Sequence, residues 1–315
     1  MNEIEFRANY NKWVEAVNAA LSSYVVEKNS PEGSIYSAMR YSLMAGGKRL
    51  RPVLSLAVCE VLEGNVDDIM PFACAIEMIH TYSLIHDDLP AMDNDDYRRG
   101  RLTNHKVFGE AKAILAGDAL LNYAFEVMLD DTAQTSGGLL TCAPLDGKES
   151  SSSLLTRKVG AIKLIAKASG VSGMIGGQIV DLESEGRAID SNVLVYMHEC
   201  KTGALIKSAV MSSARVCGAN EEEISRLEYY SEKIGLAFQI KDDILDVEGN
   251  FKMMGKSAGS DEANLKSTFV TLHGLEKSKH ILENITNEAV ESLNMFGERA
   301  GFLKQLAFFI AGRES

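Results

Sequence analysis

The fold is decided by a stretch in the C-terminal third of the chain, Ile-Gly-Leu-Ala-Phe-Gln-Ile-Lys-Asp-Asp-Ile-Leu-Asp, residues 234–246. Its apolar residues recur at spacings of three and four, as Ile234, Ala237, Ile240 and Ile244 do. This is the period of an α-helix with one face turned toward a core. Three aspartates lie inside the same apolar run, so we expect a helix that carries charge into the protein.

The helical period continues along most of the chain, for example over residues 54–62 and 76–84. Alternating strand patterns are hard to find, and glycine or Asn-Gly breaks separate helical segments. We therefore predict one all-α domain over residues 1–315, with roughly ten or more helices. The best candidate for a loop is 131–156, which contains a serine run, and a second polar stretch covers 248–267.

The composition is that of a soluble globular enzyme. The 315 residues are 46% hydrophobic and 24% charged, with a net charge of −12, and that charge argues against nucleic acid as a partner. The 5 cysteines are dispersed and form no CxxC pair, which favours reduced thiols over a disulfide framework. The N-terminus lacks an apolar signal segment, and no uninterrupted apolar run could span a bilayer, so we expect a cytoplasmic protein.

Two aspartate clusters, far apart in the chain, carry the functional signal. Converging carboxylates repel one another unless a cation holds them together, and carboxylate oxygens are hard ligands that suit Mg²⁺. Magnesium commonly completes its shell with substrate phosphates, so this pattern predicts an enzyme that acts on diphosphates. The clusters consist of Asp87, Asp88 and Asp93, and of Asp242, Asp243 and Asp246.

The two clusters differ in expected geometry. On an ideal helix Asp242 and Asp246 are about 400° apart and share a face, and Gln239 lies about 40° from Asp243. Asp87 and Asp93 are too far apart for one face of an intact helix. Pro90 between them cannot continue the hydrogen-bond ladder, so we expect the chain to leave the helix there and Asp93 to return toward Asp87.

Basic residues flank both clusters. Gly46-Gly47-Lys48-Arg49-Leu50-Arg51-Pro52 places three cations beside a flexible turn, and other cations follow at Arg98, Arg99, Lys201 and Lys256. Each of these alone is usually a solvated surface charge, and the phosphate-binding motif GxxxxGK[ST] is absent. Beside paired acid clusters, arginine forks and lysine charges fit diphosphate oxygens.

Two histidines lie near the first cluster. His80 is seven residues before Asp87, about 700° along a helix, so it faces nearly the same direction and we expect it to contact a diphosphate. His86 directly precedes Asp87, which admits a His-Asp phosphohydrolase. That class needs further histidines at metal-ligand spacing, and the other histidines offer none.

At these residues the chain resembles the trans-prenyl diphosphate synthases, and the likeness covers nearly all of it. The shared motifs are Gly-Gly-Lys-Arg-Leu-Arg-Pro (46–52), His-Asp-Asp-Leu-Pro-Ala-Met-Asp (86–93), Arg-Arg-Gly (98–100), Leu-Ala-Gly-Asp-Ala-Leu-Leu (115–121), Gly-Gly-Gln (176–178), Lys-Thr-Gly-Ala-Leu (201–205), Phe-Gln-Ile-Lys-Asp-Asp-Ile-Leu-Asp (238–246) and Gly-Lys (255–256). A single DDxxD is weakly specific, whereas this ordered set is very specific.

The resemblance implies an all-α barrel of helices around a deep central cavity, the isoprenoid synthase fold, in a homodimer that uses Mg²⁺. Two ions would be held by Asp87 and Asp93 with Asp88 beside them, and a third by Asp242 with Asp243 and Asp246. Isopentenyl diphosphate would be bound by Lys48, Arg51, His80 and Arg99. The allylic diphosphate would be bound by Arg98, Lys201, Thr202, Gln239, Lys256 and Lys266.

The resemblance also implies head-to-tail prenyl transfer to dimethylallyl and geranyl diphosphate, through ionisation of the allylic diphosphate. Tyr82 lies about 7.5 Å deeper along the helix than Asp87, beside Ser83. Members of the family with an aromatic residue there resemble the fifteen-carbon farnesyl synthases, so we expect farnesyl diphosphate as the product and Tyr82 as the floor of the cavity. Replacement of Tyr82 by alanine should then lengthen the product.

Alternatives remain open. The product could have twenty carbons, as in geranylgeranyl diphosphate synthases. A terpene cyclase usually carries a different second metal motif, and a non-catalytic subunit tends to lose one aspartate cluster, whereas both are intact here. The C-terminus, Gly-Arg-Glu-Ser, contains one basic residue, Arg313, which is little basis for predicting closure of the site by the tail.

Overall fold

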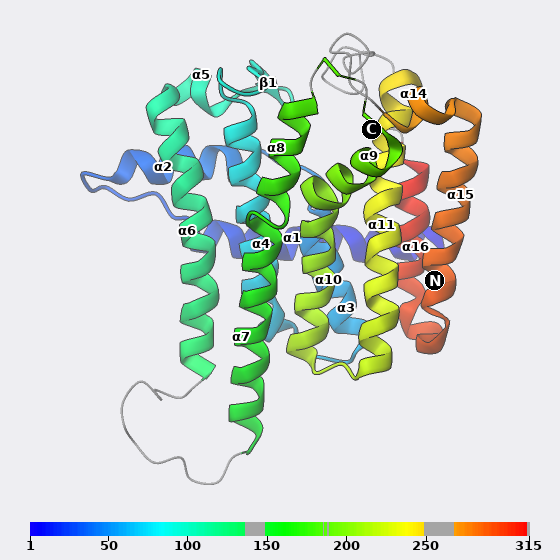
Figure 1. Ribbon diagram of the computed structural model, residues 1–315. Helices are drawn as coiled ribbons and strands as arrows, with labels where there is room; N and C mark the ends of the chain where they lie inside the picture. Colours follow the sequence, from blue (N-terminus) through cyan, green and yellow to red (C-terminus); the bar gives the residue numbers. More distant parts are fainter. Residues whose placement is uncertain (136–148, 185, 188, 249–267, 314–315) are drawn as a thin grey trace.

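The computed structural model describes residues 1–135, 149–184, 186–187, 189–248 and 268–313 (Figure 1). The N-terminal part contains α1 (Glu3–Tyr24), α2 (Gly33–Leu43), α3 (Leu50–Val61), α4 (Val66–Asp87), β1 (Tyr97–Arg98), β2 (Arg101–Leu102), α5 (Asn104–Phe108) and α6 (Glu110–Thr135). The C-terminal part contains α7 (Glu149–Ser169), α8 (Met174–Ser184), α9 (Ser191–His198), the π-helical turn η1 (Glu199–Gly203), α10 (Ala204–Cys217), α11 (Glu221–Glu248), α14 (Phe269–His273), α15 (Leu275–Ser292), the 3₁₀ turn η2 (Asn294–Ala300) and α16 (Gly301–Gly312). The all-α prediction is confirmed.

The helix expected from residues 234–246 is the C-terminal half of α11. Its four periodic residues, Ile234, Ala237, Ile240 and Ile244, are all buried. The helix expected over residues 76–84 lies in α4, which is buried on almost every side. A helix that is apolar all round belongs inside a protein, and α4 is this central helix.

Helix packing places both aspartate clusters at one end of a common core. α4 packs against α6 and α3, while α10 packs against α3, α7 and α11. The long helices run roughly parallel or antiparallel, and α1 crosses behind them (Figure 1). One hydrophobic cluster reaches from Phe6 in α1 to Ile310 in α16. The boundaries of the predicted domain, residues 1–315, stay a prediction.

A short hairpin follows the first aspartate cluster. β1 and β2 pair antiparallel, with Arg98 opposite Arg101, and the turn between them consists of Arg99 and Gly100. Both turn residues have positive φ, 53° and 73°, as tight two-residue hairpins require. The sequence did not predict these strands. They matter because the hairpin directs the side chains of Arg98 and Arg99 to different partners, Asp88 and the Gly46 carbonyl.

The prediction of a loop over 131–156 is wrong at both ends. α6 continues to Thr135, and α7 begins at Glu149. The buried amine of Lys158 in α7 explains the extension of α6, because it lies 2.9 Å from Asp131 Oδ2 and donates to Thr135 Oγ1 at 2.8 Å. It also lies 2.8 Å from Asp68 Oδ1 at the start of α4. A buried cation so paired ties the start of α4 and the end of α6 to the middle of α7. The remaining part of the loop, 136–148, lies outside the described residues.

One described stretch, Ser153–Ser184, has the length and apolar composition of a membrane span, with a hydropathy of 1.2. It consists of two helices, α7 and α8, that are separated by the turn at 170–173. α7 packs against α10 and α6. Core helices of soluble proteins pass the same test, so the stretch is weak evidence for a membrane.

Candidate active site

The first aspartate cluster forms where α4 ends. Asp87 is the last residue of the helix, and Asp88 follows as its cap. The chain then turns through Pro90 and comes back, so that the Asp93 N–H donates to the Asp87 carbonyl oxygen at 2.8 Å. The expected departure from the helix and the return of Asp93 toward Asp87 are both confirmed.

The carboxylate of Asp87 lies in an environment that disfavours its charge. Burial raises the pKa of Asp87 to about 6; Asp93 and Asp88 raise it further, whereas Lys201 and Arg98 oppose the rise. Cations therefore approach this carboxylate without fully compensating it. A site of this kind favours an additional positive charge.

Asp88 has a different environment from Asp87. Arg98 Nε donates to both of its carboxylate oxygens, at 2.7 and 3.0 Å, and Arg98 Nη2 lies 2.6 Å from Oδ1. Asp88 is buried beneath this forked pair. The pair fixes the guanidinium of Arg98 next to the first aspartate cluster, which a single hydrogen bond would not do.

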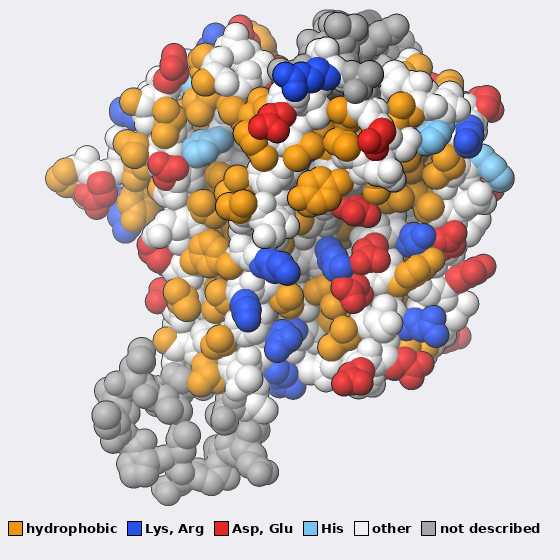
Figure 2. Space-filling model, viewed as in Figure 1, with side chains coloured by type: hydrophobic (Ala, Val, Ile, Leu, Met, Phe, Trp, Pro, Cys, Tyr) orange, Lys and Arg blue, Asp and Glu red, His pale blue; other side chains and the backbone are white. Residues whose placement is uncertain are grey.

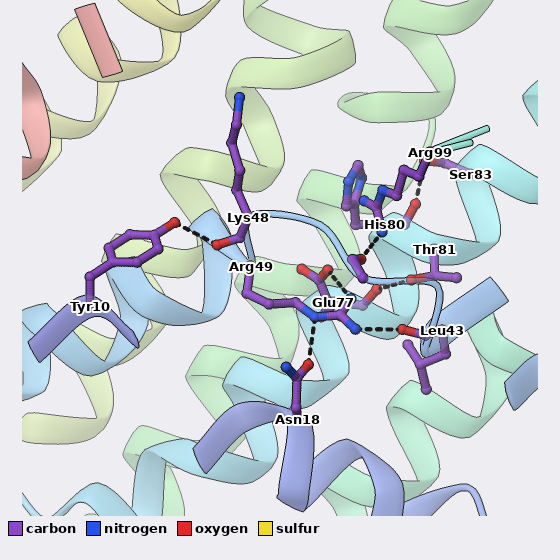
Figure 3. Close-up of polar contacts among 11 residues, drawn as sticks. Tyr10, Asn18, Leu43, Lys48, Arg49, Glu77, His80, Thr81, Ser83 and Arg99 are labelled. Atoms are coloured by element: carbon purple, nitrogen blue, oxygen red, sulfur yellow. Dashed lines mark hydrogen bonds and ion pairs between the residues drawn. The ribbon is translucent and has the colours of Figure 1, made fainter. Parts of the chain in front are cut away.

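The loop before α3 is held by a residue that the sequence analysis did not select. Arg49 has a left-handed backbone, and its buried guanidinium pairs with Glu77 at 2.8 Å and donates to Asn18 and to the Leu43 carbonyl (Figure 3). Lys48 points the opposite way from Arg49 in the close-up (Figure 3), and its carbonyl accepts from Tyr10. Arg49 therefore anchors the loop.

Arg99 crosses to the same loop from the hairpin. Its Nη1 donates to the Gly46 carbonyl (Figure 3). A Cβ on Gly47, which has φ of 113°, would lie 2.5 Å from the Arg99 guanidinium carbon, so only glycine leaves room for this contact.

Arg51, His80 and Arg99 form a group with unmet demand for an anion. Burial lowers the pKa of His80 well below its usual value, and Arg51 and Arg99 lower it further, so the ring is neutral at neutral pH. Burial also lowers the pKa of Arg51 to about 10. Among the described residues, Arg51 Nε is buried without a hydrogen-bond partner. Such a donor needs an acceptor, and a phosphate oxygen is a suitable one.

A cavity of about 630 Å³ extends from Asp87 along the inner side of α4. Arg51, His80 and Lys201 lie on its polar part. Its remaining walls are largely apolar and include Leu84, Leu89, Ile114, Leu121, Met174, Ile175, Ile179 and Leu182. Tyr82 and Ser83, the residues expected at its floor, both line it.

Lys201 and Thr202 lie on the π-helical turn η1 and line the same cavity. π-Helical turns are frequent at functional sites. Lys201 Nζ donates to Asp181 Oδ2 at 2.6 Å. Burial opposes the charged form of Lys201, but Asp181 and Asp87 outweigh it and raise the pKa of the amine. A Cβ on Gly177 would lie 2.2 Å from the backbone nitrogen of Lys201, so this glycine permits close contact between α8 and η1.

The second aspartate cluster lies on α11, and its residues point to different partners. Asp242 Oδ1 accepts from Arg313 Nη2 at 2.7 Å, while Asp243 Oδ2 accepts from the Phe269 N–H at 2.7 Å. Gln239 Nε2 lies 3.0 Å from His198 Nδ1, and His198 Nε2 lies 3.9 Å from Asp243 Oδ2. Gln239 and Asp243 thus share a face, as predicted, whereas Asp243 is engaged in holding the start of α14.

The donors present fit magnesium. They are carboxylate oxygens, the ligands that magnesium prefers, and burial raises the pKa of Asp87 despite nearby cations. Within the described residues no group of three or more His, Cys, Asp and Glu side chains is already gathered at metal-binding distance. Asp87, Asp93 and Asp242 would hold magnesium together with oxygens from another source.

Several predicted residues cannot be placed. Lys256 and Lys266 lie outside the described residues, as does most of the polar stretch 248–267. Four residues of the site were missed: Arg49, Glu77, Asp181 and Arg313. Asp181 follows Gln178 by three residues, so it shares a helix face with it, and that spacing was an available signal. Nothing in the local sequence separates Arg49 from its neighbours Lys48 and Arg51.

Known proteins are similar to this chain over nearly its whole length. The sequence profile of the polyprenyl synthetase family matches residues 32–298. A farnesyl diphosphate synthase of Micrococcus luteus is 44% identical over 94% of this chain and 95% of its own length. A geranylgeranyl diphosphate synthase of Cyanophora paradoxa is also 44% identical, over 92% of each chain. The crystal structure of a Zymomonas mobilis FPP/GFPP synthase superposes with a TM-score of 0.83, at 33% identity over 98% of this chain and 99% of that one.

Proposed function

The chain belongs to the polyprenyl synthetase family and is a trans-prenyl diphosphate synthase, and from this premise we propose that it makes farnesyl diphosphate. It condenses isopentenyl diphosphate with dimethylallyl diphosphate, and then with geranyl diphosphate. The proposal rests on one cavity that has Asp87 and Lys201 at its polar part and Tyr82 among its apolar walls. A diphosphate needs the polar part, and the hydrocarbon chain that grows from it needs the adjoining apolar part.

Lys48, Arg51, His80 and Arg99 bind isopentenyl diphosphate in this proposal. The buried Nε of Arg51 supplies a donor that has no other partner among the described side chains. Neutral His80 can donate a hydrogen bond to the diphosphate without adding a fourth positive charge to those of Lys48, Arg51 and Arg99. Arg49 and Glu77 position the loop that carries Lys48 and the start of α3, where Arg51 lies.

Arg98, Lys201, Thr202 and Gln239 bind the allylic diphosphate, together with Lys256 and Lys266. Asp88 and Asp181 fix the first two of these cations beside Asp87. Preorganised charges of this kind stabilise the negative charge that develops on a leaving group. The apolar walls exclude water, which would otherwise quench the allylic cation before the alkene attacks it.

Asp87 and Asp93, with Asp88 beside them, would hold two magnesium ions, and Asp242, with Asp243 and Asp246, would hold a third. When bound, magnesium neutralises the diphosphate and makes it a better leaving group. Asp88, Asp242 and Asp243 already accept hydrogen bonds from Arg98, Arg313 and the Phe269 backbone, respectively. We therefore place Asp87 and Asp93 first as ligands, and Asp242 as a ligand that magnesium gains in competition with Arg313.

The chain length of the product rests on Tyr82. Tyr82 is 7% exposed and lines the cavity about one and a half turns before Asp87, where it limits the space for a growing chain. A twenty-carbon product is the second candidate, because the farnesyl and geranylgeranyl synthases compared above are equally similar to this chain. A non-catalytic subunit is less well supported, since both aspartate clusters and their cations are intact.

We further propose a cytoplasmic homodimer. Large apolar side chains are exposed on α6, among them Leu115 and Leu129, and Figure 2 shows hydrophobic side chains spread over this side of the molecule. Single apolar residues are normal on a surface, whereas several on one side favour an interface. Light scattering of the purified protein tests the dimer.

The decisive experiment is a product assay with isopentenyl and dimethylallyl diphosphates, with and without Mg²⁺, in which chain lengths are resolved. Metal-dependent farnesyl diphosphate supports the full proposal. Metal-dependent twenty-carbon product keeps the chemistry and rejects Tyr82 as the floor. No condensation under any metal condition rejects the enzyme and favours the non-catalytic subunit.

A further inference from the structure

The imidazole of His86 occupies the space between α4 and α6, one helical turn from Tyr82. The two rings meet edge to face, with centroids 5.6 Å apart and planes at 84°. Both residues line the cavity. His86 therefore lies between the expected floor of the cavity and the aspartate at its polar part.

A hydrogen bond ties the His86 ring to α6. Nε2 lies 3.0 Å from the Ile114 carbonyl oxygen. A carbonyl can only accept, so Nε2 carries the proton and donates. Asp118 Oδ1 lies 3.8 Å from the same nitrogen, too far for a hydrogen bond. The ring is thus fixed by a backbone atom and not by a neighbouring charge.

Gly117 provides the room for this ring. A Cβ at this position would lie 2.1 Å from His86 Nε2 and 2.4 Å from Cδ2. Glycine inside a helix lowers its stability, and α6 tolerates that cost at the one point where the histidine meets its backbone. The motif Leu-Ala-Gly-Asp therefore acts together with the His-Asp-Asp motif on α4.

Tyr82 has few other constraints on its ring orientation. In the part of the chain that the structure describes, its hydroxyl makes no hydrogen bond, and packing alone determines its rotamer. The edge-to-face contact with His86 is the one aromatic pair of this ring among the described residues. Loss of the His86 ring would leave Tyr82 free to turn out of the path of the chain.

We propose that His86 is a positioning residue for product length: docked against Gly117 and Ile114 of α6, it holds the Tyr82 ring across the cavity. This inference rests on the proposed function and names a determinant of its specificity. It also explains why the floor needs two helices, since α4 supplies both rings and α6 supplies the surface that fixes them.

The test measures the ratio of the next longer product to the main wild-type product, from the same substrates and Mg²⁺. The variants are His86→Ala, His86→Phe, Gly117→Ala, Tyr82→Ala and the double variant His86→Ala/Tyr82→Ala, with Asn122→Ala on the exposed face of α6 as control. We expect His86→Ala and Gly117→Ala to raise the ratio by about two- to tenfold, the range of an aromatic pair. His86→Phe keeps a ring beside Tyr82 and should retain most of the wild-type ratio.

The double variant decides whether His86 acts through Tyr82. The inference predicts the same ratio for His86→Ala/Tyr82→Ala as for Tyr82→Ala. An additive increase would mean that the imidazole is itself the barrier, and would overturn the positioning role. An unchanged ratio in His86→Ala overturns the inference outright. The inference also fails if His86→Ala and Gly117→Ala both fold but lose all activity. Absence of elongation in the wild type would instead reject the proposed function.

Discussion

Arg313, two residues from the end of the chain as given, lies against Asp242 of the second aspartate cluster. Its Nη2 is 2.7 Å from Asp242 Oδ1 and donates to the Phe238 carbonyl at 2.8 Å. The guanidinium carbon also lies 3.9 Å from the centroid of the Phe238 ring. Burial lowers the pKa of the nearby Lys48, and Arg313 lowers it further. The end of α16 therefore places a cation between two groups of the proposed site.

Replacement of Arg313 by methionine should make the second cluster easier to load with metal. Asp242 would lose its ion pair with the Arg313 guanidinium, so magnesium would no longer compete with that cation for the carboxylate. Because the Asp242 side chain is 46% exposed, solvent screens the pair, and we expect half-saturation at a Mg²⁺ concentration about two- to fivefold lower. A magnesium titration of the activity measures this shift. Arg299→Met, which removes an exposed pair with Glu63, is the control; an unchanged half-saturation in Arg313→Met rejects the competition.

The sequence predicted both ends of the site because the chemistry is local there. The aspartates, their basic neighbours and the break at Pro90 are close in sequence, and their side chains have few alternative uses. The Arg313–Asp242 pair joins residues that are 71 positions apart. The sequence alone does not say which way the C-terminal residues fold back, so this contact could not be predicted.

The buried pair of Arg49 and Glu77 sets a second limit to sequence analysis. Lys48, Arg49 and Arg51 are alike in type, yet of the three it is Arg49, with its left-handed backbone, that forms the ion pair with Glu77. Glu77, within an apolar stretch of α4, is the signal that a buried cation is needed nearby. Glu77 therefore predicts that a cation lies nearby, but the sequence does not identify which of the three basic residues it is.

We expect Glu77→Ala to be strongly destabilising. The guanidinium of Arg49 and the carboxylate of Glu77 are only 1% and 2% exposed, and removal of one partner of such a pair costs about 3–5 kcal/mol. The loop with Lys48 and the first turn of α3 with Arg51 should loosen, so KM for isopentenyl diphosphate should rise more than KM for the allylic substrate. Urea denaturation and steady-state kinetics measure the two effects. The matched control is Arg49→Met/Glu77→Met, which should recover much of the lost stability; a single variant as stable as wild type contradicts the account.

Asp181→Asn should lower activity by releasing Lys201. The carboxylate accepts from Lys201 Nζ at 2.6 Å and is the largest favourable influence on the charge of that amine. An amide keeps the shape but removes the charge, so Lys201 should lose its fixed position, at a cost of about tenfold or more in kcat/KM. Kinetics with each substrate varied in turn measure this, and the KM for the allylic substrate should respond most. Glu183→Gln on the same helix is the control. An effect confined to isopentenyl diphosphate would place Lys201 in the other subsite.

The pKa of Asp87 predicts how metal-free stability depends on pH. The folded pKa is about 6, above the ordinary 3.8, so between these values the folded state binds more protons than the unfolded state, and stability falls as pH rises. Asp87→Asn removes the buried charge and should stabilise the metal-free protein at pH 7.5 by about 1–3 kcal/mol. The difference from wild type should shrink by about 1 kcal/mol when the pH is lowered to 5. Urea unfolding in the presence of a chelator measures both, and the exposed Asp130→Asn should show neither effect. If Asp87→Asn is instead less stable than wild type at pH 7.5 without metal, the carboxylate is already compensated, and the argument that this site demands a cation fails.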